Sequence, residues 1–176
     1  MKCPLPDDAL LARYARTDAY TDCFRTEVTG AISFAEYVIA FYTTPLFKLE
    51  RAILKFAVAR PSSDADASRL AAGETDSFAA WYVEARAENE ILLCDFRNRT
   101  RSWLMVSSLH DETGTRTQLY FGSAVTPIRD RHFGKPSLGW GFAALGWFHK
   151  LYSVALLYSA KFRLQLNVPP TTGLEA

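Results

Sequence analysis

The chain has 176 residues, 49% of them hydrophobic and 14% aromatic, and its 20 basic and 19 acidic residues leave a net charge of +1. This length and apolar content predict a single domain over 1–176, with a core at about 20–164 and flexible termini. The near-neutral charge, without a basic stripe interleaved with aromatic residues, argues against a nucleic-acid partner.

The first elements are a short arm and a strand. Residues 7–17 fit a short helix or an ordered arm. Apolar and polar residues alternate over 20–28, which is the pattern of a half-buried strand, and Gly30 breaks it.

Two short helices are predicted after this strand. Ser33, with Glu36 three residues later, is a capping-box signal for a helix over 34–42. A second helix, roughly 45–58, begins with a proline, which suits a first helical turn, and ends before Pro61.

A polar segment then leads into a run of strands. Residues 61–77 are small and polar and predict a surface loop with one helical turn at 65–71. Four strand candidates follow at hairpin spacing: 78–86, 90–97, 101–109 and 116–127. The Asp-Glu-Thr-Gly sequence between the last two is the strongest turn signal.

The last element is one long apolar helix over 140–164. The only stretch long enough to cross a membrane is 138–160, but His149 and Lys150 lie at its centre. We therefore expect no integral membrane span and interpret the helix as buried or covering a cavity.

The cysteines are three in number, Cys3, Cys23 and Cys94, and lack metal-ligand spacing. They predict reduced thiols rather than a disulfide framework. Because the N-terminus has no signal-peptide core, a cytoplasmic location is expected. No histidine and carboxylate triplet has zinc spacing and no phosphate-binding loop is present, so neither metal nor cofactor is expected.

This order of elements predicts an α+β protein of the helix-grip type. In that fold a curved antiparallel β-sheet wraps around a long C-terminal α-helix, with two short helices after the first strand. The usual version has one or two more strands than this sequence suggests. The aromatic surplus is typical of a protein that lines a cavity, here between sheet and helix.

Four short segments resemble an uncharacterised bacterial family related to the START-like (SRPBCC) superfamily. They are 90–93, 101–106, 121–125 and 147–152. The resemblance covers roughly 20–164 and implies the helix-grip fold and a hydrophobic pocket, without an established activity. The chain departs from the family pattern where a Gly-aromatic stretch, rather than a proline, precedes the helix histidine.

His149 is the leading candidate for chemistry. It shares one helical face with Phe142, Leu145 and Tyr152, and this face continues to Leu156 and Ala160. In a helix-grip fold the face looks into the cavity, where a neutral imidazole could bind a ligand or act as acid or base. The alternative is a core histidine bonded to a carbonyl or carboxylate.

A charged cluster is predicted around one turn. Asp95 and Arg97 share a strand face, and Arg99 and Arg101 lie in or just past the turn. At a cavity mouth these arginines could clamp a carboxylate or phosphate. The alternative is a solvated turn with exposed ion pairs of little energetic value.

Aromatic strand residues complete the candidate ligand-binding set: Tyr82, Trp103, Tyr120 and Phe121. Alternation puts Trp81 with Val83 on one face and Tyr82 with Glu84 on the other, and the sequence leaves open which face lines the cavity. The alternative is ordinary packing on both sides of the sheet.

Three functions remain open. The first is binding of a small apolar, aromatic or lipid-like molecule. The second is an acid/base enzyme of the cyclase or dehydratase type, with His149 assisted by Tyr82 or Asp95. The third is an interaction module that forms a homodimer, because the aromatic residues of the last helix cannot all face one direction.

Overall fold

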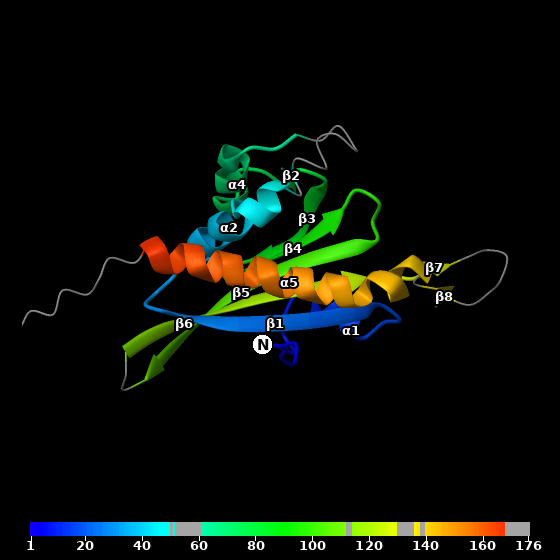
Figure 1. The fold of residues 1–176 in the computed structure, drawn as a ribbon, viewed down its shortest axis with the longest axis horizontal. Coiled ribbons are helices and arrows are strands. Elements are labelled where there is room, and N and C mark those ends of the chain that lie inside the picture. Colours follow the sequence, from blue (N-terminus) through cyan, green and yellow to red (C-terminus); the bar gives the residue numbers. More distant parts are fainter. Residues whose placement is uncertain (50, 52–60, 112–113, 130–135, 138–139, 168–176) are drawn as a thin grey trace, which may run out of the picture.

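The structure, a computed structural model, is described for most of the chain (Figure 1). The described residues are 1–49, 51, 61–111, 114–129, 136–137 and 140–167. Side chains are described at 1–49, 51, 61–110, 114–127 and 151–166.

In the described part of the chain, six strands form one antiparallel sheet. They are β1 (Tyr20–Thr29), β2 (Ser77–Phe78), β3 (Trp81–Ala87), β4 (Glu90–Asp95), β5 (Thr100–Asp111) and β6 (Gly114–Val125). Their order across the sheet is β1-β6-β5-β4-β3-β2, so the sixth strand pairs with the first. A separate ribbon joins β7 (Ile128–Arg129) to β8 (Pro136–Ser137).

Helices cover this sheet. They are α1 (Ala12–Ala15), α2 (Phe34–Tyr42), α4 (Asp64–Ala71) and α5 (Trp140–Asn167). In Figure 1, α5 runs along β1 on the same side of the sheet as α2 and α4. The α+β class and the long C-terminal helix are therefore confirmed. Within the described residues, no helix has both the length and the hydropathy needed to span a lipid bilayer.

Both faces of the sheet are buried, and the strand register assigns residues to each. Phe24, Phe121 and Leu104 lie opposite one another across β1, β6 and β5 and pack beneath the helices. One position along, Cys23 and Trp103 point to the opposite face, because successive strand residues alternate. We call the face under α2, α4 and α5 the helix side, and the opposite face the N-terminal side.

The helix side holds an aromatic core. The ring centroids of Phe41 and Phe121 are 5.0 Å apart, and Tyr42 lies 4.8 Å from Phe47 and 5.0 Å from Phe78. These contacts join α2 to β2 and β6.

The N-terminal side is covered by residues 1–15, which we call the N-terminal segment. Its start pairs with the free edge of β1, since the Cys3 amide donates to the Cys23 carbonyl at 3.0 Å. Farther along, Leu11 is fully buried in a second core with Trp103 and Tyr120. The segment therefore closes an edge of the sheet and buries one of its faces.

Two helices begin at capping boxes. Ser33 caps α2, and its backbone N–H donates to Glu36 at 2.8 Å, as the sequence predicts. Ser63 and Asp66 form the same motif at α4, with a corresponding bond of 2.8 Å. This second box explains why an eight-residue helix replaces the single turn expected at 65–71.

Several predicted boundaries are corrected. The expected strand 78–86 is two strands, separated where Ala79 has a φ of 52°. The strand expected at 90–97 ends at Asp95, so Arg97 lies in a turn and shares no strand face with it. Helical turns begin the expected second helix at 45–49, and its remainder lies largely outside the described residues.

Candidate functional site

A buried carboxylate lies on the helix side of the sheet. Asp22 of β1 is only 4% exposed and sits directly opposite Ser123 of β6. The hydroxyl of Ser123 donates to Oδ1 of Asp22 at 2.6 Å, and the backbone N–H of Ser123 donates to the same oxygen at 3.1 Å. Tyr20 donates its hydroxyl to Oδ2 at 3.2 Å. These bonds offset part of the cost of burying a carboxylate.

We call Tyr20, Asp22 and Ser123 the Asp22 cluster. Burial raises the pKa of the Tyr20 phenol to about 12, and the neighbouring Asp22 carboxylate adds to this shift. Tyr20 therefore keeps its proton at neutral pH and remains a hydrogen-bond donor.

The surroundings of the Asp22 cluster are mainly apolar. Two residues along β1, Phe24 belongs to the helix-side core, as does Phe121 on β6. Ser102 of β5 adds a further polar group, because it pairs with Ser123 and is 8% exposed. The cluster is thus a small polar patch in an apolar wall.

Helix α5 lies over this patch. It packs on β1 and β6, and Figure 1 shows its first half alongside the start of β1. Ser153 is buried on the inner face of α5, where Leu156 and Ala160 join the helix-side core. Tyr152 packs against that core from a half-buried position, so the predicted inner face of the helix is confirmed over 152–160.

Three predicted site residues belong to the first half of α5: Phe142, Leu145 and His149. Their side chains lie outside the described ones. Position 149 is one helical turn before Ser153 on the same side of α5.

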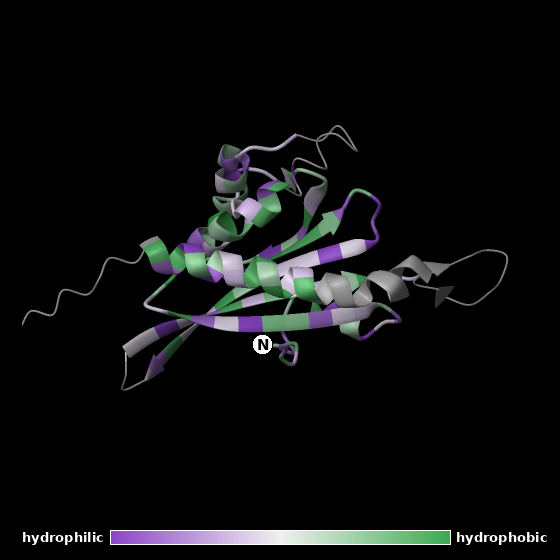
Figure 2. Cartoon of the chain, in the orientation of Figure 1, coloured by the Kyte–Doolittle hydropathy of each residue, from purple (hydrophilic) through white to green (hydrophobic). Residues whose placement is uncertain are grey.

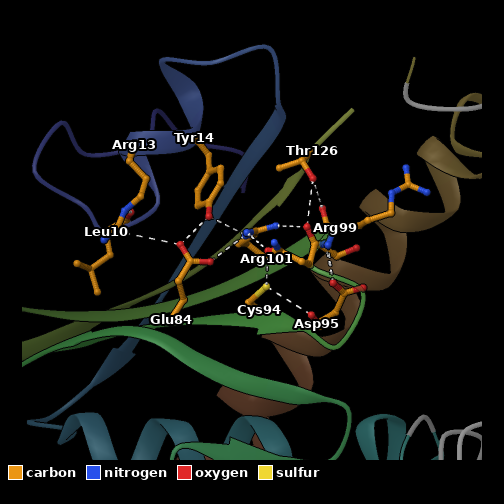
Figure 3. A network of polar contacts seen from close by, with 11 residues as sticks. Leu10, Arg13, Tyr14, Glu84, Cys94, Asp95, Arg99, Arg101 and Thr126 are labelled. Carbon is orange, nitrogen blue, oxygen red and sulfur yellow. Dashed lines mark hydrogen bonds and ion pairs between the residues drawn. The ribbon is translucent and has the colours of Figure 1, made fainter. Parts of the chain in front are cut away.

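A second polar network lies on the N-terminal side (Figure 3). The Arg101 side chain is 7% exposed, and its Nε donates to the Tyr14 hydroxyl at 2.7 Å and to Glu84 at 3.0 Å. Its Nη1 and Nη2 donate to the backbone and side-chain oxygens of Asn98. All three nitrogens of the guanidinium therefore donate to groups of the chain itself.

Tyr14 links the N-terminal segment to this network. Its hydroxyl donates to Glu84 at 2.5 Å, and its ring centroid lies 4.7 Å from the Arg101 guanidinium carbon. Burial, helped by the hydrogen bond to Glu84, raises the pKa of Tyr14 to about 12. Glu84 follows Val83 of the helix side, so strand alternation turns it to the N-terminal side, and a bulge between Val83 and Ala85 leaves it without a strand partner.

Glu90 fixes a second point of the N-terminal segment. One of its carboxylate oxygens accepts from the Leu10 backbone at 2.9 Å and from the Trp103 indole at 2.6 Å. Tyr14 and Leu10 are thus both bonded to the sheet through acidic side chains. The contacts on this side of the sheet therefore hold the N-terminal segment in place.

The predicted ligand-binding set is divided between the two faces. Phe121 and Tyr152 lie on the helix side, whereas Trp103 and Tyr120 belong to the core on the N-terminal side. Trp103 and Tyr120 therefore cannot line a cavity beneath α5, because the register turns them to the opposite face.

Tyr82 and Arg101 also lie away from α5. Tyr82 is 40% exposed and pairs with Cys94, which in turn pairs with Arg101. Trp81 and Val83 pack against the helix-side core, so the predicted separation of Tyr82 from Trp81 is confirmed. Tyr82 therefore faces away from the side of the sheet that α5 covers.

The bonds of Arg101 argue against the predicted anion clamp there, because each of its three nitrogens already donates to a partner within the chain. Asp95 accepts from the backbone of Arg99 at 2.7 Å and of Thr100 at 3.1 Å, so it caps the turn. Arg97 is exposed and lies over the Phe96 ring at 5.3 Å. The four charged residues therefore do not form one binding site.

The two histidines other than His149 lie away from the Asp22 cluster or outside the described residues. His110 is an exposed strand residue beside Thr115, and His132 lies outside the described residues. Across the described side chains, no three His, Cys, Asp or Glu residues converge as a metal site would require.

Asp22 is the residue that the sequence reasoning missed. A signal was present, since Asp22 lies two residues before Phe24 and six before Val28, on the apolar face of an alternating strand. A carboxylate on such a face is unusual and marks a candidate site.

Comparisons with known proteins add no assignment. No protein-family model matches the chain, and no curated protein matches it.

Proposed function

We propose that this protein is a START-like, helix-grip protein that binds a small apolar, aromatic or lipid-like molecule between the sheet and α5. The observation that carries the proposal is the Asp22 cluster, a buried carboxylate with two hydroxyl neighbours in an apolar wall beneath α5. Small-molecule sites typically combine an apolar lining with few, well-placed polar groups. The three free cysteines favour a cytoplasmic location.

The chemistry of the cluster narrows the ligand. An ionised carboxylate only accepts hydrogen bonds, so Asp22 suits a hydroxyl or amino group on the ligand. Phe24 and Phe121 supply apolar surface for the body of the molecule. The best-fitting ligand is therefore largely apolar with one donor group.

Native mass spectrometry of freshly purified protein, compared with the denatured mass, tests the proposal. A retained small molecule is the expected result, and Asp22→Asn should lower its occupancy because the amide is a weaker acceptor. Tyr14→Phe is the matched control, since it removes a hydroxyl on the opposite side of the sheet and should leave occupancy unchanged.

A second measurement tests binding directly if the natural ligand is lost during purification. Titration with a fluorescent fatty alcohol should show saturable binding that Asp22→Asn weakens and Tyr14→Phe does not. A bare native mass together with no saturable binding would overturn the proposal.

An acid/base enzyme of the cyclase or dehydratase type on the same scaffold is the second candidate. The buried carboxylate of Asp22 favours it, and we propose Asp22 as the assisting group in place of Tyr82 or Asp95. His149, one turn before Ser153 on α5, is its proposed acid or base. The test is chemical change in a bound molecule, followed by mass, which His149→Gln should abolish without loss of binding.

A homodimer is the third candidate, and an exposed stripe on α5 favours it. Leu151, Tyr158, Phe162 and Leu166 recur along one side of the helix and are 45–70% exposed. Figure 2 shows hydrophobic residues interspersed with hydrophilic ones along the coloured part of α5. Light scattering should then give twice the chain mass, and Phe162→Gln with Leu166→Gln should return it to a monomer.

A further inference from the structure

Two of the three cysteines meet where the chain start pairs with β1. The sulfur atoms of Cys3 and Cys23 are 3.2 Å apart, although 20 positions separate them in sequence. A disulfide requires about 2.05 Å between sulfurs, so a small side-chain adjustment would join them.

The backbone already aligns the pair. Lys2 bridges Phe24 in antiparallel register, which places Cys3 directly opposite Cys23. The Cys3 amide donates to the Cys23 carbonyl at 3.0 Å, and Arg25 donates to the Met1 carbonyl at 2.9 Å. Directly opposite, hydrogen-bonded residues have Cα atoms about 5.5 Å apart, within the range that disulfides span.

The two thiols differ in their access to solvent. Cys3 is half-buried, whereas Cys23 is 3% exposed. Burial, together with the neighbouring Cys3, raises the pKa of the Cys23 thiol above its usual range. A dissolved oxidant therefore reaches Cys3 first, and Cys23 lies in place to react second.

We propose that Cys3 and Cys23 form a reversible redox pair that covalently locks the N-terminal segment onto β1. The co-reactant is a small-molecule disulfide such as oxidised glutathione. This role is separate from ligand binding, because the pair lies on the N-terminal side of the sheet and the Asp22 cluster on the helix side.

The reaction proceeds by two thiol–disulfide exchanges. The Cys3 thiolate attacks one sulfur of the small disulfide, forming a mixed disulfide and releasing one thiolate, which takes up the proton that Cys3 lost. Cys23 then loses its proton and attacks the Cys3 sulfur, releasing the second small thiol. Two protein thiols are oxidised, one small disulfide is reduced to two thiols, and excess reduced thiol reverses both steps.

A Cys3–Cys23 disulfide would fix the N-terminal segment, which covers the N-terminal side of the sheet. The segment is otherwise held by non-covalent contacts such as those of Leu11 and Tyr14. A bond at Cys3 closes a loop through this segment to β1 and restricts the unfolded chain. The oxidised protein should therefore keep the segment in place under conditions that release it from the reduced protein.

The test treats fully reduced wild-type protein with oxidised glutathione and analyses it by intact mass and non-reducing tryptic mapping. The expected product is lighter by two hydrogen atoms and contains peptide 3–13 linked to peptide 17–25. Peptide 87–97, which carries Cys94, should remain free. Added dithiothreitol should restore the original mass.

Single variants assign the order of reaction. Cys23→Ser should trap glutathione on Cys3, Cys3→Ser should lose both products, and Cys94→Ser should still form the link. Far-ultraviolet circular dichroism before oxidation checks that each variant is folded. A persistent mixed disulfide on the wild type, or links that involve Cys94 or a second chain instead, would overturn the proposal.

Discussion

Arg101 shows how one buried charge organises its surroundings. Its guanidinium is bonded to Tyr14, Glu84 and Asn98, which come from the N-terminal segment, a bulge in β3 and the turn before β5. Desolvating such a cation is costly unless it is hydrogen-bonded, and each of its three nitrogens donates at least one hydrogen bond within the network of Figure 3. Arg101 therefore joins three distant parts of the chain.

Replacing Arg101 should be strongly destabilising. Arg101→Met leaves the carboxylate of Glu84, whose side chain is 22% exposed, without its closest cation. We expect the free energy of unfolding to fall by about 3 kcal/mol in urea denaturation, somewhat less than for a fully buried pair. Arg97→Met, at an exposed position, should change it by less than about 0.5 kcal/mol.

Equal losses for Arg101→Met and Arg97→Met would contradict this role for the network. A double variant, Arg101→Met with Glu84→Gln, should recover part of the lost stability because it removes the stranded carboxylate.

The raised pKa values of Tyr14 and Tyr20 lead us to expect a loss of folding stability at alkaline pH. Both phenols have pKa values raised to about 12, from an ordinary value of 10.0, because burial disfavours their charged form. The unfolded chain then releases protons at lower pH than the folded chain. Stability is therefore fully present below pH 10 and falls as the pH rises toward 12.

Urea denaturation at intervals between pH 8 and about 11.5 measures this loss. Tyr14→Phe and Tyr20→Phe should each make the decline shallower, and the double variant shallower still. An unchanged slope in the double variant would assign the decline to other groups.

The N-terminal segment packs closely against strand β6 at Gly122. A Cβ atom there would lie 2.7 Å from Leu11, 2.9 Å from the Asp22 carbonyl and 2.9 Å from the Trp103 ring. The absent side chain allows Leu11 to approach the sheet closely. Gly122 is thus required by packing rather than by its backbone conformation.

Gly122→Ala should destabilise the fold by about 1–3 kcal/mol, which is typical of overpacking in a tight core. Thermal or urea unfolding measures the loss. Adding Leu11→Ala should recover only part of it, because the Asp22 carbonyl belongs to the β1 backbone and cannot move away. A neutral Gly122→Ala would contradict the close packing of this interface.

In the whole molecule, one face of the sheet is covered by helices and the other by the N-terminal segment. The helices α2, α4 and α5 form the thick cover, while the N-terminal segment forms a thin one over Leu92, Trp103 and Tyr120. An antiparallel sheet often leaves one face to solvent, but here both faces carry buried apolar residues. The N-terminal segment is therefore part of the folded unit.

Removal of residues 1–15 should expose this second core. We expect a less stable protein that binds the dye 8-anilinonaphthalene-1-sulfonate, because Trp103 and Tyr120 would lose their cover. A synthetic peptide of residues 1–16 should suppress the dye fluorescence when added back. Unchanged stability and no dye binding would show that the sheet does not need this cover.

Local signals in the sequence were sufficient for most elements. The alternation over 20–28 and the Ser33–Glu36 box predicted β1 and α2 to within one residue, because such patterns depend on near neighbours. The long C-terminal helix was predicted from 140 and continues to Asn167. The overlooked Ser63–Asp66 box was equally local, and reading it would have predicted α4.

Tertiary structure alone decided which faces and residues come together. Alternation separated Trp81 from Tyr82 but could not show that Trp103 packs beneath the N-terminal segment, because strand register depends on distant partners. The same holds for Asp22 beside Ser123 and for Cys3 beside Cys23, whose contacts join residues far apart in sequence. The sequence determined the elements through local backbone preferences, whereas the pairing of β1 with β6 and with the chain start determined the candidate sites.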